Sequence, residues 1–197
     1  MNLGKFNKIL LIRGYKMFLK SCFSLATVAI LAALAGQAHA ASICPADTKP
    51  LKVKGTIFSN AVSPGTTLGI AHLKISNGKN LRCGILGSGG VGLDGTTKFV
   101  DQLVCDDSLS VANPYTGRAE TVHSQLTLNT SGTGAFYPCV HNVPAAGSYG
   151  TFDEISTPIS GRGRFQGVKA GLINNRGTIN CQFGIDMEFE GEVCLPQ

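Results

Sequence analysis

The chain has 197 residues, no tryptophan and a formal charge of +5, but this positive charge lies entirely in its first 40 residues. Those residues carry five lysines and arginines and no acid, which leaves twelve basic and twelve acidic side chains in residues 41–197. A neutral chain has no field that attracts a polyanion, so we predict no binding to nucleic acid.

Residues 1–40 have the features of a secretory signal peptide. Basic residues come first, an apolar run follows at Phe23–Ala35, and Ala38 and Ala40 are small residues suited to the positions before a cleavage site. We therefore predict Sec-type export to the periplasm or the exterior, with cleavage after Ala40. The remaining residues, 41–197, are then the mature protein.

Two alternatives concern the same segment. An uncleaved membrane anchor is conceivable because no charge occurs between Lys20 and Asp47, a stretch long enough to span a bilayer. We favour cleavage, and hence no stable membrane anchor afterwards, because the run is rich in alanine and ends in an Ala-x-Ala site. Translation starts at Met1 or Met17.

Residues 41–197 consist of short apolar runs separated by Gly, Asn, Asp and Pro, without helical periodicity. This pattern predicts one all-β domain, either an antiparallel barrel of about eight strands or a β-sandwich. The strands expected before the C-terminal third are Leu51–Phe58, Thr67–Ser76, Leu81–Leu86, Thr96–Cys105, Glu120–Thr130 and Gly134–Val140. Asn77-Gly78, between the second and the third, is a strong hairpin signal. The loops expected between strands are Ser59–Gly65, Gly87–Gly95 and Asn142–Gly150.

The glycine-dense segment Gly87–Gly95 has the composition of a phosphate-binding loop. Such a loop needs a helix directly after it, whose N-terminal amides face the anion, or a Gly-Lys-Ser/Thr sequence. A strand-like sequence follows instead. We therefore predict a flexible loop that binds no nucleotide.

Three histidines of the mature chain, His72, His123 and His141, suggest a zinc or copper site. No His-x-His or His-x₃-His spacing supports one, so we favour surface or structural roles and predict neither metal nor cofactor. There is no Gly-x-Ser-x-Gly elbow either, and a Ser-His-Asp triad cannot be assembled from spacing alone. We assign no catalytic residue.

The C-terminal third contains a Gly-x-Gly-x-Phe-x-Gly-x-x-x-Gly unit, formed by Gly161, Gly163, Phe165, Gly167 and Gly171. Glycines there permit positive φ and close strand approach, while Phe165 is expected to enter a core. The unit resembles the turn of the allene oxide cyclase-like and dirigent-like β-barrels. The resemblance implies an eight-stranded antiparallel barrel with a central cavity, in a group that includes cyclases and stereochemistry-guiding proteins acting on apolar ligands. None of that group's catalytic residues maps onto this chain.

Arg162, Arg164 and Lys169 form a basic cluster around this unit. One alternative is that they meet an anionic ligand at a barrel mouth. The other, which we favour, is that they pair with acids of the last strand. Arg162 and Arg164, together with His72 and His123, are our candidate residues for a ligand or surface site.

The last strand alternates between apolar and acidic residues. Because strand side chains alternate at period two, its acids share one face. They are Asp186, Glu188, Glu190 and Glu192. Such a row can serve acid-base chemistry or bind Ca²⁺, but we favour a solvated outer face, because acids spaced along one strand do not converge on one ion.

Cys22 leaves with the signal segment, and six cysteines remain, without any Cys-x-x-Cys spacing. In an exported protein an even set of six predicts three disulfides, with 15 formal pairings. We pair Cys83 with Cys105 because they lie on consecutive strands, and Cys44 with Cys194 because they lie near the two mature ends. Elimination leaves Cys139 with Cys181.

Three functions remain open. We favour a non-enzymatic exported barrel that binds a small apolar or amphipathic ligand, or a protein partner. A cyclase or isomerase-like enzyme of the same barrel type is the second, and a surface-interaction protein is the third. Polar side chains converging inside the barrel would favour the enzyme, whereas a filled apolar interior would exclude both ligand-based functions.

Overall fold

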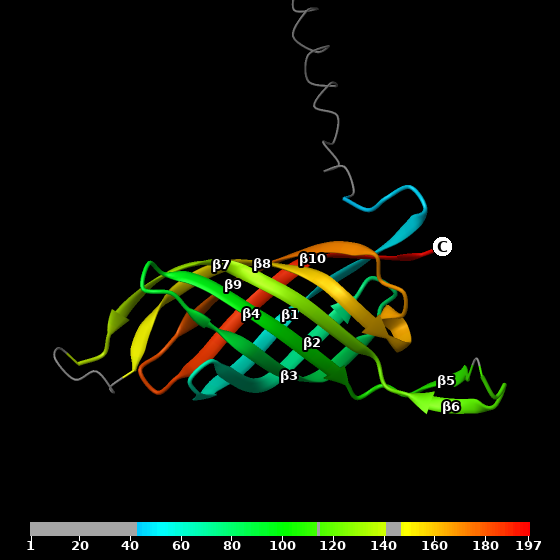
Figure 1. Cartoon of the computed structure of the whole chain (residues 1–197), viewed down its shortest axis with the longest axis horizontal. Coiled ribbons are helices and arrows are strands. Elements are labelled where there is room, and N and C mark those ends of the chain that lie inside the picture. The colour runs from blue at the N-terminus through cyan, green and yellow to red at the C-terminus, as the bar shows by residue number, and fades with distance from the viewer. Residues whose placement is uncertain (1–42, 114, 141–146) are drawn as a thin grey trace, which may run out of the picture. The chain divides into compact units, whose positions relative to one another are not determined.

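Within the described part of the chain, eight long strands form a closed antiparallel barrel (Figure 1). The computed structural model describes residues 43–113, 115–140 and 147–197. The strands pair in the order β1-β10-β9-β8-β7-β4-β3-β2, and β2 pairs with β1 to close the barrel. Their bounds are β1 Thr48–Ser63, β2 Thr66–Ile75, β3 Asn80–Val91, β4 Thr96–Cys105, β7 Gln125–Pro138, β8 Ser148–Arg162, β9 Ala170–Ile179 and β10 Gly184–Pro196. The predicted all-β barrel is confirmed, and the sandwich alternative is excluded.

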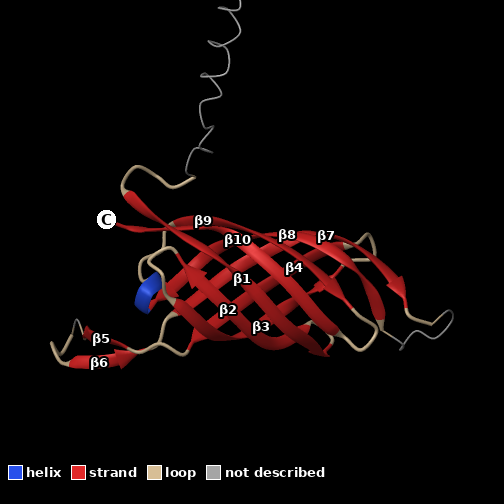
Figure 2. Ribbon diagram, turned by 180° about the vertical axis from the view of Figure 1, so that it is seen from behind, coloured by secondary structure: helices blue, strands red, loops and turns tan. Residues whose placement is uncertain are grey.

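Two short strands stand apart from the barrel. β5 (Leu109–Ala112) and β6 (Ala119–Val122) form a hairpin that projects beyond the barrel end carrying the single-turn helix η1 (Gly163–Phe165), as Figure 2 shows. The predicted strand Glu120–Thr130 is therefore wrong in one respect, because it is interrupted at His123 and divided between β6 and β7. No helix in the described segments is long and apolar enough to cross a bilayer.

Two predicted loops are largely strand. β1 and β3 continue through the first part of Ser59–Gly65 and Gly87–Gly95, respectively. At Gly89 a Cβ atom would lie 1.9 Å from the carbonyl oxygen of Lys98 on β4. Glycine here permits close strand pairing and does not end the strand. Of the predicted loop Asn142–Gly150, residues 148–150 belong to β8, and residues 142–146 lie outside the described part.

Strand alternation decides which side chains face inward. In β3 the residues Leu81, Cys83 and Ile85 are buried, and the residues between them are exposed. In β10 the predicted division is confirmed, because Met187 and Phe189 line the interior while acids occupy the outer face. The pairing register places two lysines of β1 across from two of these acids: Lys52 lies opposite Glu192 and Lys54 opposite Glu190.

The corner between β8 and β9 fills one end of the barrel. η1 brings Phe165 to 0% exposure within the main core, where Val168 packs beside it. Gly163 and Gly167 have φ values of +65° and +70°, which side chains with a Cβ rarely adopt. The structure thus confirms that this unit is a barrel corner and that its phenylalanine enters the core.

Three disulfides fasten the described chain. Cys83 and Cys105 face each other in the pairing of β3 with β4 and are joined. Cys44 is joined to Cys194, which ties the segment before β1 to β10. The third bond joins Cys139 to Cys181. These are the pairs inferred from the sequence, and they are consistent with an oxidising compartment outside the cytoplasm.

Candidate functional site

The barrel contains a cavity of about 470 Å³. This volume falls within the range of small-molecule sites, about 300–1,000 Å³. Much of the wall is apolar and comes from β1, β2 and β10, with Ile57, Leu73 and Phe189 among its side chains. Residues of the β1–β2 turn and the end of β3 also line the cavity, so it extends to the barrel end opposite Phe165.

One side of the interior is polar. Thr97 and Asp101 come from β4, Thr130 from β7, Glu154 and Ser156 from β8, and Asn175 from β9. The register makes this a continuous surface, because Thr130 lies opposite Ser156 and Glu154 lies opposite Asn175. Gly132 lies between Thr97 and Glu154 in the same register, so no side chain separates these two residues.

Four of these side chains form a chain of hydrogen bonds. Asn175 Nδ2 donates to Ser156 Oγ over 2.7 Å, and Ser156 Oγ lies 2.7 Å from Thr130 Oγ1. Thr130 Oγ1 in turn donates to Asp101 Oδ2 over 2.6 Å. Since Thr130 has one hydroxyl proton and gives it to Asp101, Ser156 must donate to Thr130. The chain therefore directs its donors toward the carboxylate of Asp101.

The two acids of the cavity differ in surroundings but share one perturbation. Burial raises the pKa of Asp101, an effect that the hydrogen bond from Thr130 partly offsets. Burial likewise raises the pKa of Glu154, Thr97 lowers it in part, and the nearby charge of Asp101 raises it further. Although Thr97 adjoins Glu154, its Oγ1 is buried and has no partner in hydrogen-bonding geometry. The site thus holds two proton-binding groups and one unpaired hydroxyl.

These raised pKa values link stability to pH. An acid whose pKa is higher in the folded than in the unfolded protein favours folding when protonated, and this stabilisation is lost as pH rises from about 4 through the folded pKa. At neutral pH we expect the double variant Asp101→Asn/Glu154→Gln to have a free energy of unfolding about 1–3 kcal/mol higher than that of the wild type. Denaturant titrations at several pH values should show this difference shrinking toward pH 4, and a difference that grows on acidification would contradict the assignment.

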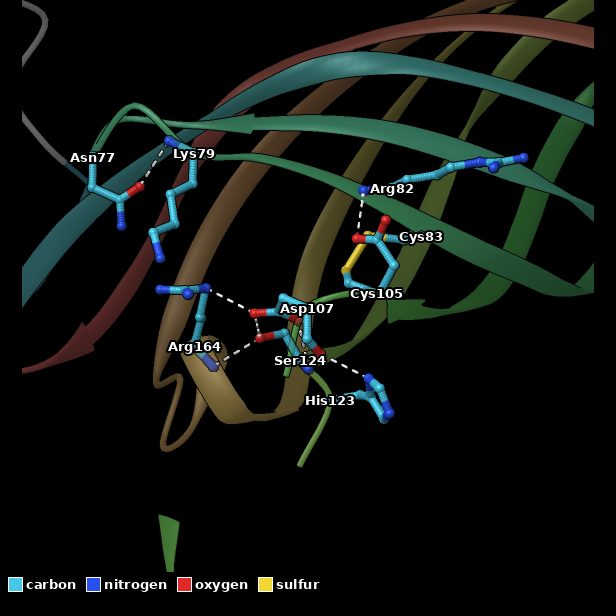
Figure 3. Close-up of polar contacts among 10 residues, drawn as sticks. Asn77, Lys79, Arg82, Cys83, Cys105, Asp107, His123, Ser124 and Arg164 are labelled. Atoms are coloured by element: carbon cyan, nitrogen blue, oxygen red, sulfur yellow. Dashed lines mark hydrogen bonds and ion pairs between the residues drawn. A yellow bond between two sulfur atoms is a disulfide. The ribbon is translucent and has the colours of Figure 1, made fainter. Parts of the chain in front are cut away.

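The predicted ligand-site residues lie outside the cavity. Arg164 Nε forms an ion pair with Asp107 Oδ2 at 2.8 Å, beside the base of the β5–β6 hairpin (Figure 3). Arg162 and His72 are exposed, and the cavity wall includes neither. These residues therefore do not line the cavity, and a contact between them and a ligand stays a prediction.

The favoured alternative for that cluster was pairing with acids of the last strand. It is incorrect for Arg164 and Lys169. Arg164 pairs with Asp107, and Lys169 forms an ion pair with Asp47. Hydrogen bonds from Ser124 and the Arg164 pair outweigh the effect of burial and hold the pKa of Asp107 below its ordinary value. The cluster attaches the barrel corner to neighbouring loops.

Ser124, His123 and Asp107 meet in this same region without forming a catalytic triad. His123 Nδ1 contacts the backbone oxygen of Asp107 at 2.7 Å, and Ser124 Oγ donates directly to Asp107 Oδ2 (Figure 3). A triad needs histidine between serine and acid. Ser124 is fully buried and also accepts a bond from the backbone N–H of Arg164, so it is a structural connector.

The metal hypothesis finds no matching cluster in the described residues: no three His, Cys, Asp or Glu side chains there are placed to hold an ion. His72 and His123 lie on different strands or loops of the outer surface. His141 lies outside the described residues.

The polar side of the cavity was not predicted from the sequence. Its only signal was the occurrence of acids and amides at alternate positions beside apolar residues, as in Phe99-x-Asp101-x-Leu103. The comparisons with known proteins add no candidate residue, since no family model, curated protein or solved structure matches this chain.

Proposed function

We propose that the protein binds a small amphipathic ligand inside its barrel. The observation that carries this proposal is a cavity of about 470 Å³ with a hydrogen-bonded polar side and a largely apolar wall elsewhere. Protein interiors are normally close-packed, and buried polar groups cost stability unless they are paired. A barrel whose only task was to be stable would have no use for such an interior, whereas a ligand site would.

Export is part of this proposal. The signal-peptide features lie in residues 1–40, outside the described part, and the three disulfides suit an oxidising compartment. We infer cleavage after Ala40 and function in the periplasm or outside the cell. The proposed ligand also suits the resemblance to the allene oxide cyclase-like and dirigent-like barrels, which implies a central cavity and apolar ligands.

A cavity-filling substitution tests ligand binding. Ser59 lines the cavity and is 7% exposed, and the next residue on β1, Asn60, is exposed on the outer face. We expect Ser59→Phe to weaken binding of the neutral fluorophore prodan by about tenfold or more, because the added ring occupies the space of the ligand. The matched variant Asn60→Phe should bind as wild type does. Equal binding by all three proteins would place the dye elsewhere and contradict the proposal.

An acid-base enzyme of the isomerase type is the second candidate, and the raised pKa values of Glu154 and Asp101 favour it. Carboxyls whose pKa values are raised by burial suit general acid-base catalysis. Such an enzyme would move carbon-bound protons of its ligand. Incubation in D₂O should then place deuterium on carbon atoms of the bound ligand in wild type and not in Glu154→Gln. A ligand that binds without hydrogen–deuterium exchange at carbon would contradict the enzyme function and leave only the binding function.

The surface-interaction function stays a prediction. Phe58 and Leu68 are about half exposed on the outer face of β1 and β2. Sedimentation velocity of the wild type and of Phe58→Lys tests this function. Self-association of the wild type that is lost in Phe58→Lys would support it, and a monomer in both cases would contradict self-association through this face.

A further inference from the structure

The charge distribution of the cavity is one-sided. Among the described residues that line it, Asp101 and Glu154 are acidic, and none is lysine, arginine or histidine. The ion pairs of the described residues lie outside the cavity; Arg176, for example, pairs with Asp153, next to Glu154 on β8. Any compensation for charge on the two interior carboxyls must therefore come from protons or from a ligand.

The hydrogen bonds inside the barrel supply only part of this compensation. The donor chain from Asn175 ends on Oδ2 of Asp101. It does not include Glu154, whose neighbour Thr97 has a buried oxygen without a partner. A buried polar atom without a partner lowers the stability of the fold. The region between Asp101, Glu154 and Thr97 therefore offers oxygens that call for a donor.

The apolar wall faces this polar side across the cavity. On the strands that lie across the barrel, β1, β2 and β10, it includes Ile57, Leu73 and Phe189, while the two acids of the polar side come from β4 and β8. A ligand matched to both must carry hydrogen-bond donors at one end and hydrocarbon at the other. An ammonium group has three donors, no acceptor and a positive charge, which suits two carboxyls and a hydroxyl oxygen.

We propose that the ligand is a primary-amine amphiphile whose ammonium head lies between Asp101, Glu154 and Thr97 and whose hydrocarbon packs on the opposite wall. This inference rests on the proposed ligand-binding function and names the class of ligand. Carboxylate or phosphate amphiphiles are disfavoured because they would bring like charge to the two acids. Neutral alcohols of the same length share the apolar contacts but do not neutralise the site.

The test compares three ligands with one hydrocarbon chain: decylamine, decanol and decanoic acid. Each is used below its micelle-forming concentration to displace prodan at neutral pH, from wild-type protein and its variants. We expect decylamine to displace the dye at about tenfold lower concentration than decanol, and decanoic acid to be the weakest. The amine preference should increase with pH as the carboxyls lose their protons.

Variants locate the preference. In Asp101→Asn/Glu154→Gln the advantage of decylamine over decanol should fall to about onefold, while decanol itself binds as before and thereby shows that the barrel is folded. The control is Glu188→Gln, an exposed acid on the outer face of β10 between Met187 and Phe189, which should keep the full preference.

The possible failures are distinguishable. Equal displacement by decylamine and decanol, a preference for decanoic acid, or an amine preference that survives in Asp101→Asn/Glu154→Gln would overturn the amine inference and leave the ligand-binding function intact. If neither prodan nor any decyl compound binds the wild-type protein, both proposals fail.

Discussion

Replacing Phe165 with alanine is expected to lower the free energy of unfolding by about 3–5 kcal/mol, the range measured for large aromatic truncations in protein cores. The side chain is 0% exposed and belongs to the main core at the barrel end opposite the cavity mouth. Its removal leaves a void in the core at the corner between β8 and β9, and the disulfide-fastened strands have little freedom to collapse into it. Denaturant-induced unfolding at neutral pH measures the effect.

The neighbouring residue provides the control for this prediction. Gln166 is exposed just after η1, so Gln166→Ala should change the free energy of unfolding by less than about 0.5 kcal/mol. A Phe165→Ala protein as stable as Gln166→Ala would show that this corner does not close the core.

Removing the disulfide between Cys44 and Cys194 should lower stability by about 2–4 kcal/mol. The bond joins residues 150 positions apart and ties the segment before β1 to β10. In the unfolded chain it closes a long loop, and the entropy of that constraint is the main stabilisation expected. Cys44→Ala/Cys194→Ala, compared with wild type by chemical denaturation under oxidising conditions, gives the value.

The bond between Cys139 and Cys181 is the matched comparison, because it spans 42 positions. Chain entropy makes its removal less costly than removal of the long-range bond by about 1 kcal/mol. The opposite ranking would show that local strain or residual structure outweighs loop length.

Some parts of the fold follow directly from local patterns in the sequence. From Ile185 to Val193 the last strand alternates acidic residues with apolar residues or glycine, and this pattern predicts its outer face. Asn77-Gly78 forms the predicted hairpin, in which Gly78 has a φ of +83° and Asn77 Oδ1 accepts a bond from the backbone N–H of Lys79. The positions of the cysteines on consecutive strands and near the two ends, followed by elimination, likewise suggested the three disulfides found.

The candidate site did not follow, because its residues occur in strands with two similar faces. In β4 the inner face holds Phe99, Asp101 and Leu103, while the outer face holds Val100 and Val104. Both faces are mixtures of polar and apolar residues, so period-two alternation cannot decide which one lines the interior. Only the pairing of β4 and β8 with β7 brings Asp101 and Glu154 to the same side of one cavity.

The glycines misled the analysis for a related reason. Gly89 was interpreted as part of a loop because glycine usually interrupts strands. In the barrel it lies where the backbone of β4 comes too close for a side chain. Local propensity cannot distinguish these two uses of glycine, since the difference lies in a contact with a distant strand.

Native mass spectrometry shows directly whether the cavity holds a ligand. Wild type, Ser59→Phe and Asn60→Phe are exported, purified without denaturation and weighed intact, first as isolated and then after addition of decylamine. We expect the wild type and Asn60→Phe to show the additional mass of a non-covalently bound molecule, either as isolated or after decylamine is added. We expect Ser59→Phe to show none. The mass of the polypeptide alone in all three proteins, both before and after the addition, would contradict ligand binding in the cavity.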